Sequence, residues 1–319
     1  MDWRVKAVVQ GVLSRMPAGN VLNDGLQHLA GGRADEAQHI DMKFRSDWLV
    51  LMRVLRELKF DVQGQSLMEV GTGWMPVLPL CFALSGARTV HSFDLNRHLI
   101  HSTVPTVLAR LGLHLSALAA ASGQSETVVR ERHAWLTGEG QGRAQDAGER
   151  ILELAGIQYH APADATCTGL PDGSVSLVFS NSVLEHVCAS VLGPLMAESK
   201  RLLTRHGVAL HSVNCGDHYA YFDRSITPLN YLQFTAEQWS RWNNKLLYQN
   251  RLRPSDFTAL ARNHGLQVIH QSQTERQDLL SKLPPDSIAP EFRHYATGDL
   301  CSTSVTFAAR TAEPPWCAP

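Results

Sequence analysis

The stretch Ser66-Leu67-Met68-Glu69-Val70-Gly71-Thr72-Gly73 carries the strongest indication of the fold. Here an apolar run ends in an acid and two glycines, and a second apolar run ends at Ser92-Phe93-Asp94-Leu95-Asn96. Gly71 and Gly73 allow a sharp turn and a close approach of the backbone to a ligand. Asp94 lies 21 residues after Gly73 (94 − 73), near the spacing of roughly 20 for an acid that binds ribose hydroxyls. These residues predict a nucleoside-bearing cofactor at the tips of neighbouring parallel strands.

The residues around the glycines argue against a dinucleotide that contains pyrophosphate. Glu69 precedes the turn, where a carboxylate would repel phosphate. Met75 and Pro76 occupy the place of the third glycine of the dinucleotide fingerprint. A cofactor with a cationic, phosphate-free middle suits this acid better. Taken alone, a Gly-x-Gly pair is equally typical of a plain strand-to-helix turn, so the other motifs decide between the two interpretations.

The composition is that of a globular protein with no bulk attraction to nucleic acid or membranes. The 319 residues are 44% apolar and 18% charged, with a formal net charge of -1. The start of the chain, residues 1–6, leads into no apolar segment of the kind found in secretory signals. The cysteines form no Cys-x-x-Cys pair; they are Cys81, Cys167, Cys188, Cys215, Cys301 and Cys317. Such scattered thiols are typical of a reducing compartment, so we expect a cytoplasmic protein that binds neither nucleic acid nor a membrane.

From residue 66 onward, short apolar runs alternate with helical patterns. The expected strands are residues 66–70, 89–93, 158–160, 175–179, 208–213, 266–270 and 302–308. The expected helices are residues 76–85, 96–111, 192–203 and 254–264. Gly86 and Gly207 carry the stop signal of a helix end. Alternation of this kind predicts βαβ units, and therefore an α/β fold with a doubly wound parallel sheet.

Four segments define the expected organisation. Residues 1–60 read as a helical N-terminal cap, and residues 61–319 as the main domain. Within that domain, residues 97–156 are too long for a plain crossover and predict a helical insertion. Residues 214–253 are irregular and aromatic, which predicts a lid over the substrate; an insertion that packs its own small core, or a dimer face, is the alternative. The aromatic residues are Tyr219, Tyr221, Phe222, Tyr231, Phe234, Trp239, Trp242 and Tyr248.

Two further motifs follow the third and fourth expected strands. Ala163-Asp164-Ala165-Thr166 can offer an acid to an adenine amino group, and residues 180–187 read Ser-Asn-Ser-Val-Leu-Glu-His-Val. Together with the glycine turn and Asp94, they make the chain resemble a class I S-adenosylmethionine-dependent methyltransferase. The resemblance covers residues 64–213 and extends to the last two strands, which resemble the closing antiparallel hairpin of that family. It implies a seven-stranded, Rossmann-like sheet and S-adenosyl-L-methionine as the cofactor.

The resemblance also implies cofactor contacts at the strand ends. Those near the methionyl part are Glu69, Gly71 and Gly73. Those near the ribose are Asp94, Leu95 and Asn96, the last of which is also typical of a simple helix cap. Those near the adenine are Asp164 and Ala165, and those on the floor of the methyl-transfer site are Ser180 and Asn181. Met75 departs from the family, many members of which keep a third glycine there.

Four polar residues at the ends of the fourth and fifth strands are candidates to orient or deprotonate the methyl acceptor: His186, His211, Asp217 and His218. Methyl transfer is an in-line displacement at a sulfonium, so the protein mainly positions the nucleophile, and a hydroxyl acceptor also benefits from a base. Each candidate has a structural alternative. His186 suits a helix start, His211 a satisfied core position and Asp217 a turn cap.

Substrate-binding candidates come from the aromatic segment and its arginines: Tyr219, Arg224, Tyr231 and Arg251, with Arg253 as a further clamp. Aromatic rings attract a sulfonium, and arginine binds carboxylate or phosphate through two parallel hydrogen bonds. The runs 214–219 and 248–251 resemble a bacterial methyltransferase subgroup whose members tend to act on small molecules or surface saccharides.

The expected activity is transfer of a methyl group to O, S or N of a small molecule, and the sequence leaves a homodimer open. A metal site is not expected. His211, Cys215, Asp217 and His218 have suitable ligand types, but a strand followed by a loop rarely brings three ligands together. Metal-assisted transfer and binding of the cofactor without transfer are the alternatives. An NAD-dependent oxidoreductase and a nucleic-acid methyltransferase are more distant ones.

Overall fold

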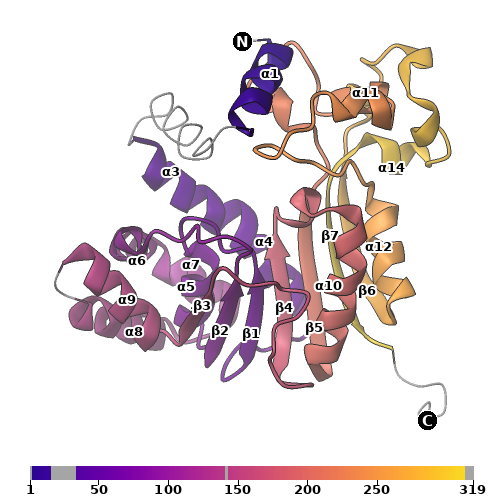
Figure 1. The fold of residues 1–319 in the computed structure, drawn as a ribbon. Helices are drawn as coiled ribbons and strands as arrows, with labels where there is room; N and C mark the ends of the chain where they lie inside the picture. The colour runs from indigo at the N-terminus through magenta and orange to yellow at the C-terminus, as the bar shows by residue number, and fades with distance from the viewer. Residues whose placement is uncertain (1, 16–33, 141–142, 313–319) are drawn as a thin grey trace.

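The computed structural model describes residues 2–15, 34–140 and 143–312, and its centre is one seven-stranded sheet (Figure 1). The strands are β1 (Ser66–Val70), β2 (Thr89–Phe93), β3 (Ile157–His160), β4 (Val175–Asn181), β5 (Leu203–Asn214), β6 (Leu266–Glu275) and β7 (Ser302–Thr311). Their order is β3-β2-β1-β4-β5-β7-β6. The pairs among β1 to β5 are parallel, whereas β7 runs antiparallel to both β5 and β6. The predicted doubly wound α/β fold with its closing antiparallel hairpin is therefore confirmed.

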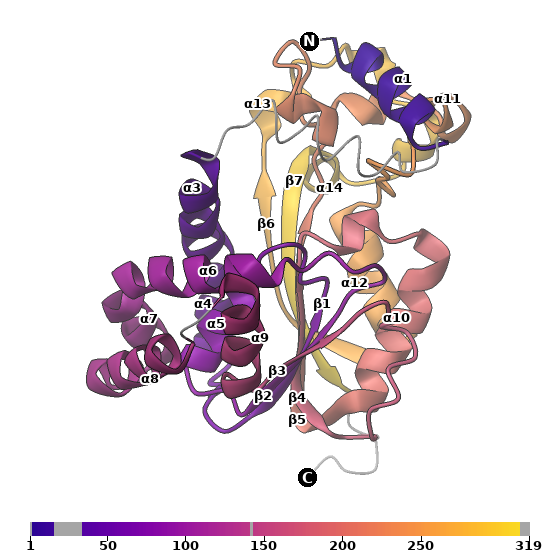
Figure 2. The same ribbon diagram turned by 60° about the vertical axis from the view of Figure 1, so that its left-hand side comes forward.

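Helices cover both faces of the sheet because neighbouring strand residues point to opposite sides. Leu67 packs with the helices that precede β3, whereas Met68 packs with the later helices. On the first face lie α3 (Ala34–Met42), the π-helix η1 (Lys43–Trp48), α4 (Leu49–Glu57) and α5 (Val77–Leu84). On the second lie α10 (Ala189–Leu202) and α12 (Pro254–Asn263), as Figure 2 shows. Burial on both faces explains why the central strands β1 and β4 are almost wholly buried, whereas the edge strand β6 is largely polar.

The long segment between β2 and β3 is helical, as expected. It consists of η2 (His101–Thr103), α6 (Val104–Leu111), η3 (Gly112–His114), α7 (Leu115–Ser122), α8 (Glu126–Glu139) and α9 (Ala144–Leu154). The run His101–Ser122 is long and apolar enough to cross a bilayer by length and composition. Val104, Leu111 and Leu118 are fully buried in the first-face core, which accounts for that composition.

Two of the differences from the predicted helix boundaries have a clear physical cause. The helix expected from residue 96 begins only at Val104, because the amides of His98 and Leu99 bond to the hydroxyl of Tyr159 instead of building a helical turn. Gly207 is not a helix end either. It lies inside β5, which begins at Leu203 and pairs with β4 on both sides of a bulge.

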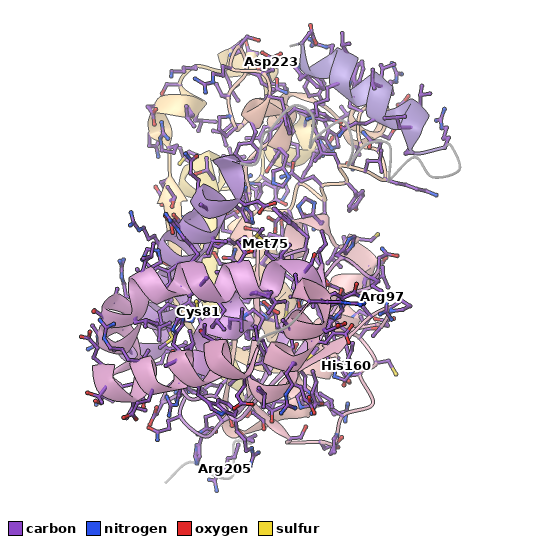
Figure 3. The ribbon with its side chains drawn as sticks, turned by 90° about the vertical axis from the view of Figure 1, so that its left-hand side faces the viewer. Met75, Cys81, Arg97, His160, Arg205 and Asp223 are labelled. Atoms are coloured by element: carbon purple, nitrogen blue, oxygen red, sulfur yellow. The ribbon has the colours of Figure 1, made fainter. Side chains whose placement is uncertain are left out.

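The first N-terminal helix and the aromatic segment form a separate upper lobe, made of α1 (Trp3–Leu13) and residues 214–253 and 276–301 (Figure 1). Its other short elements are η5 (His218–Tyr221), η6 (Asn230–Gln233), α11 (Ala236–Ser240), α13 (Gln277–Leu280), η7 (Pro285–Ser287), η8 (Pro290–Phe292) and α14 (Thr297–Cys301). The Trp3 amide donates to Asp223 over 3.0 Å. Figure 3 shows Asp223 in this lobe and Arg205 at the opposite end of the molecule.

The upper lobe corrects the expectation of an aromatic lid. Tyr219, Tyr231 and Trp239 are buried around Trp3 in a core of their own, the alternative that the sequence left open. The residues expected to form one N-terminal cap occupy two places, since α1 joins the lobe while α3, η1 and α4 pack on the sheet. Residues 16–33 of that segment, like Cys317, lie outside the described residues.

Candidate functional site

The glycine turn after β1 has the sharp, left-handed backbone that the sequence predicts. Gly71 and Gly73 have φ angles of 79° and 72°, in the left-handed region that favours glycine. A Cβ on Gly71 would lie 2.5 Å from a methyl group of Val183, whereas one on Gly73 would meet nothing within 4 Å. Gly71 therefore serves close packing, and Gly73 borders open space at the end of the sheet. Met75 is buried in the core at the position where the family often has glycine.

Glu69 lies beneath this turn and is almost fully buried. Its Oε2 accepts hydrogen bonds from the hydroxyls of Thr72 at 2.7 Å and Ser92 at 2.8 Å. Burial nevertheless raises the pKa of this carboxyl to about 8, because the two hydroxyls only partly offset the lost hydration. A buried carboxyl of this kind favours a cationic group next to it.

Asp94 ends β2 beside the glycine turn. The hydroxyl of Tyr159 donates to its Oδ2 over 2.9 Å, and that same hydroxyl accepts the amides of His98 and Leu99. The Thr72 and Gly73 amides also favour the ionised carboxylate, although burial raises its pKa overall. Tyr159 was not among the predicted site residues. Its only sequence signal is its place in the strand next to β2, where it pairs with Ser92.

The loop after β3 is joined to the end of β2. The amide of Ala163 donates to the carbonyl of Asp94 over 2.9 Å, which brings the next residues beside the acid. Asp164 is exposed, and its Oδ1 accepts from the amide and the hydroxyl of Thr166, so one of its oxygens closes a local turn. Leu95 leaves 72% of its surface exposed, an unusual fraction for a leucine beside a buried acid. Asn96 is exposed and starts no helix.

Two predicted residues lie inside the sheet. Ser180 and His211 pair across β4 and β5, are fully buried and share a hydrogen bond of 2.8 Å. Burial lowers the pKa of His211 to about 4, so its imidazole is neutral. The structure thus places His211 in the core position that the sequence left as its alternative. The neighbouring Asn181 reaches the surface of a cleft.

A cleft of about 720 Å³ lies at this edge of the sheet, between the first-face helices and the lobe. Residues at the ends of α3, η1 and α4, including Lys43 and Asp47, form one wall, and residues of β6 and β7 form another. Its lining from β4, β5 and the start of the lobe is Asn181, Ser182, Ser212, Val213, Asn214, Gly216, Asp217, Tyr221 and Pro228. Tyr221, one of the aromatic residues of the expected lid, is exposed there.

Asp217 borders the cleft but is held by the lobe. Its Oδ1 caps η5 by accepting the Tyr219 amide, and its Oδ2 accepts from the side chain of Asn230, both at 2.9 Å. Burial raises its pKa to about 6. With both oxygens occupied, Asp217 acts as the turn cap that the sequence left as the alternative.

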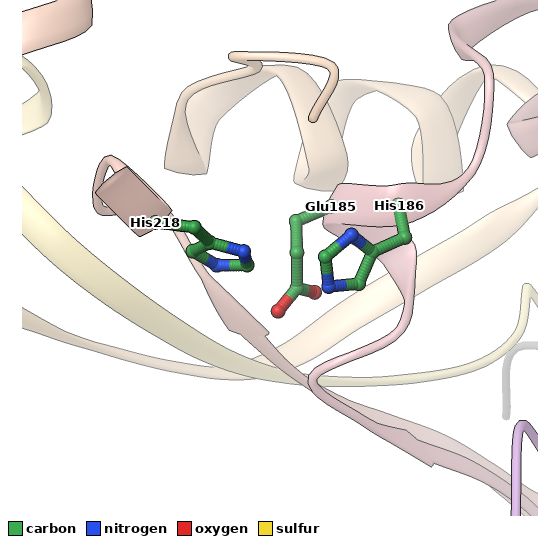
Figure 4. Close-up of side chains that lie close together, drawn as sticks. All are labelled: Glu185, His186 and His218. Atoms are coloured by element: carbon green, nitrogen blue, oxygen red, sulfur yellow. The ribbon is translucent and has the colours of Figure 1, made fainter. Parts of the chain in front are cut away.

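The other two predicted histidines do meet. His186 follows β4 in η4 (Leu184–His186), His218 begins η5, and their ring centroids are 4.9 Å apart. Figure 4 shows the carboxylate of Glu185 between the two rings. Ligand atoms of the three residues all lie within 4.8 Å of one another. Sequence reasoning quoted Glu185 only as part of a motif and gave it no role.

The electrostatics of this cluster are set by burial. Glu185 is 1% exposed, and burial raises its pKa to about 8. His218 is 7% exposed, and burial, with some contribution from His186, lowers its pKa to about 3. His186 lies at the solvent-exposed rim. The cluster therefore presents neutral imidazoles around a carboxyl group that forms no ion pair with a described residue, although the charge of Lys43 weakly favours its ionised form.

The predicted substrate-binding residues do not line the cleft. The hydroxyl of Tyr219 donates to the carbonyl of Trp242 over 2.7 Å, and Tyr231 is fully buried. Arg251 pairs with Glu291 at 3.0 Å and bonds to a lobe carbonyl, whereas Arg224 is exposed. The physical reason is that a lobe with little regular structure leaves carbonyls unpaired, and buried side chains bond to them.

No family model and no curated protein matches the chain. Among solved structures, it is similar to an S-adenosylmethionine-dependent methyltransferase from Mesorhizobium loti, with 16% identity, 81% of this chain and 96% of that chain covered, and a TM-score of 0.43. It is also similar to geranyl diphosphate C-methyltransferase from Streptomyces coelicolor A3(2), with 12% identity and a TM-score of 0.43; the match covers 86% of this chain and 83% of that chain. A third similar structure is a TehB-like S-adenosylmethionine-dependent methyltransferase from Corynebacterium glutamicum, with 11% identity and a TM-score of 0.40; the match covers 88% of this chain and 100% of that chain.

Proposed function

We propose that this protein is a class I S-adenosylmethionine-dependent methyltransferase that acts on O, S or N of a small molecule. The observation that carries this proposal is the arrangement at the tips of β1 and β2. There, Asp94 stands beside the left-handed Gly71–Gly73 turn, and the buried Glu69 lies under that turn. A carboxylate at the end of β2 suits two ribose hydroxyls, and an acid under the turn suits a cation rather than a pyrophosphate.

The residues present fit such a cofactor along the whole edge. Glu69 and Gly73 would border its cationic methionyl part, Asp94 its ribose and the exposed Leu95 one face of its adenine. The cofactor supplies an electrophilic methyl group whose leaving group is a neutral thioether. The chain itself has to hold the acceptor in line and exclude water. The cleft beside Asn181 is the proposed acceptor site. The His186–His218 pair is the proposed polar group; neither histidine is among the cleft's lining residues, but Asp217, the neighbour of His218, is.

Titrations of the full chain with S-adenosylmethionine and with NADH test the cofactor. We expect saturable binding of S-adenosylmethionine and no comparable binding of NADH, because the carboxyl of Glu69, ionised or neutral, offers no positive charge to a pyrophosphate. A preference for NADH would refute the proposal. Incubation with S-adenosylmethionine and a metabolite extract, followed by mass spectrometry, tests transfer. A product heavier by one methyl group is expected, and tight binding without any such product would favour a binding protein.

The pKa of Glu69 predicts how cofactor binding depends on pH. The carboxyl is protonated below about pH 8 in the free protein, whereas a cation beside it requires the carboxylate. Affinity for S-adenosylmethionine should therefore fall as pH drops below 8, by up to about tenfold per pH unit. Titration calorimetry between pH 6 and 9 measures this slope. Glu69→Gln should bind more weakly and lose the slope, and a slope that persists in the variant would assign it to another group.

A further inference from the structure

The cluster of Glu185, His186 and His218 is not explained by cofactor binding or by packing. Glu185 is 1% exposed, yet neither of its oxygens has a hydrogen-bond partner of normal geometry among the described residues. The backbone amides of Glu185 and Asn214 give its charge only partial support. The Nε2 atom of His218 is also buried without a partner. Buried polar atoms are normally paired, so three in one place indicate a missing ligand.

The hydrogen bonds around His186 fix which of its nitrogens faces the cluster. Its Nδ1 lies 2.7 Å from the carbonyl of Tyr248, and a carbonyl only accepts, so Nδ1 carries the proton. The lone pair is therefore on Nε2, the ring nitrogen that Figure 4 shows beside the carboxylate of Glu185. A histidine that donates one ring N–H to a carbonyl while the other nitrogen is free is the arrangement seen in metal-binding imidazoles.

Residues 248–250 bond both to η4, which carries Glu185 and His186, and to the start of η5, which carries His218. The side-chain amide of Asn250 donates to the carbonyls of Leu184 and Val187 at 2.7 and 2.9 Å, and its backbone amide donates to the carbonyl of Glu185 at 2.9 Å. Gln249 accepts the His218 amide at 3.4 Å. Residues 248–250, part of the run whose sequence resembles a methyltransferase subgroup, thus clamp η4 against the start of η5. This clamp keeps the three side chains together without any bond among them.

We propose that Glu185, His186 and His218 bind one divalent transition-metal ion of the zinc class, with coordination positions left open beside the cleft. Two imidazole nitrogens and one carboxylate are a ligand set that suits Zn²⁺, whereas Mg²⁺ prefers oxygen ligands alone. A divalent ion would place a positive charge in direct contact with Glu185, which forms no ion pair with any described residue.

The geometry needs only a small adjustment to hold the ion. Ligand atoms around a tetrahedral Zn²⁺ lie about 3.4 Å apart when each bond is about 2.1 Å. The three candidate atoms lie within 4.8 Å of one another, so rotations of side chains on a fixed backbone bring them together. None of the three side chains is among the lining residues of the cleft, but Asp217, the neighbour of His218, is, so the site lies next to the proposed acceptor cleft. In the proposed methyl transfer the ion would orient the acceptor; this role rests on the proposed function, whereas metal binding itself does not.

Metal binding is tested with chelator-treated full-length protein and ZnCl₂ in competition with a chromogenic chelator. We expect one tightly bound Zn²⁺ per chain and no competition from equal Mg²⁺. Glu185→Gln and His218→Ala should each weaken binding by about 100-fold, and Asn250→Ala, a positioning change, by about tenfold. His206→Ala and Glu237→Gln are matched controls at exposed positions outside the cluster and should bind as the unaltered protein does.

Two measurements separate loss of the ion from loss of fold or cofactor. Without metal, Glu185→Gln should melt at or above the melting temperature of the unaltered protein, because the variant lacks the unpaired buried carboxyl. Added Zn²⁺ should raise the melting temperature of the unaltered protein but not that of Glu185→Gln. Glu185→Gln should keep its affinity for S-adenosylmethionine, and Asp94→Ala should keep Zn²⁺. Equal Zn²⁺ affinity in the unaltered protein and both ligand variants would overturn the site, and so would loss of Zn²⁺ in Asp94→Ala.

Discussion

Asp94→Ala should abolish most of the affinity for S-adenosylmethionine. The carboxylate is fixed by the hydroxyl of Tyr159 at 2.9 Å, and in the proposed complex it accepts two ribose hydroxyls. Hydrogen bonds to a charged group contribute about 1.5 kcal/mol or more each, so the loss amounts to about 3 kcal/mol, or about 100-fold in the dissociation constant. Titration calorimetry with purified variants measures this change directly.

Matched variants show whether this loss is specific. Asp146→Ala removes an exposed acid on α9 and should bind the cofactor normally. Asp217→Ala removes the cap of η5, so it should lower stability and turnover while leaving cofactor affinity unchanged. An equal loss of affinity in Asp94→Ala and Asp217→Ala would mean that the cofactor does not lie at the tip of β2.

Arg253→Ala should be the most destabilising single change in the upper lobe. Arg253 is fully buried, and its guanidinium donates to four backbone carbonyls and one hydroxyl, which belong to Cys215, Tyr231, Asp299, Leu300 and Ser302. Each buried acceptor left unpaired costs about 1–3 kcal/mol. A loss of about 5 kcal/mol is therefore expected, and a melting temperature lower by about 10 °C or more. Urea unfolding and thermal melting measure these two quantities.

Conservative and exposed substitutions make this test specific to the guanidinium. Arg253→Lys keeps the charge but offers one compact ammonium instead of a planar fork, so it should recover only part of the stability. Arg224→Ala removes an exposed arginine from the same lobe and should change stability by less than about 0.5 kcal/mol. If Arg253→Ala were as stable as the unaltered protein, the structural role of Arg253 would be wrong, and the substrate-binding role suggested by the sequence would be favoured.

The sequence alone determined the sheet and the strand-tip edge that is proposed to hold the cofactor. Strands of a buried parallel sheet are short apolar runs, and the residue after each run lies at one shared edge, so Gly71, Gly73 and Asp94 could be placed together from spacing. Both facts are local, which is why they can be predicted from pattern. The prediction of where α6 begins was wrong because the helix start depends on a distant contact. The hydroxyl of Tyr159, on another strand, accepts hydrogen bonds from the amides that would have begun the helix.

The tertiary structure alone decided what the polar and aromatic residues beyond β4 do. His211 and His218 look alike in sequence, yet one is bonded inside the sheet and the other faces Glu185. The aromatic segment turned inward because Trp3, more than 200 residues earlier in the chain, completes its core. Residue type and spacing fix which groups are available. Which buried group finds a partner, and which is left for a ligand, depends on contacts between distant segments that no local pattern records.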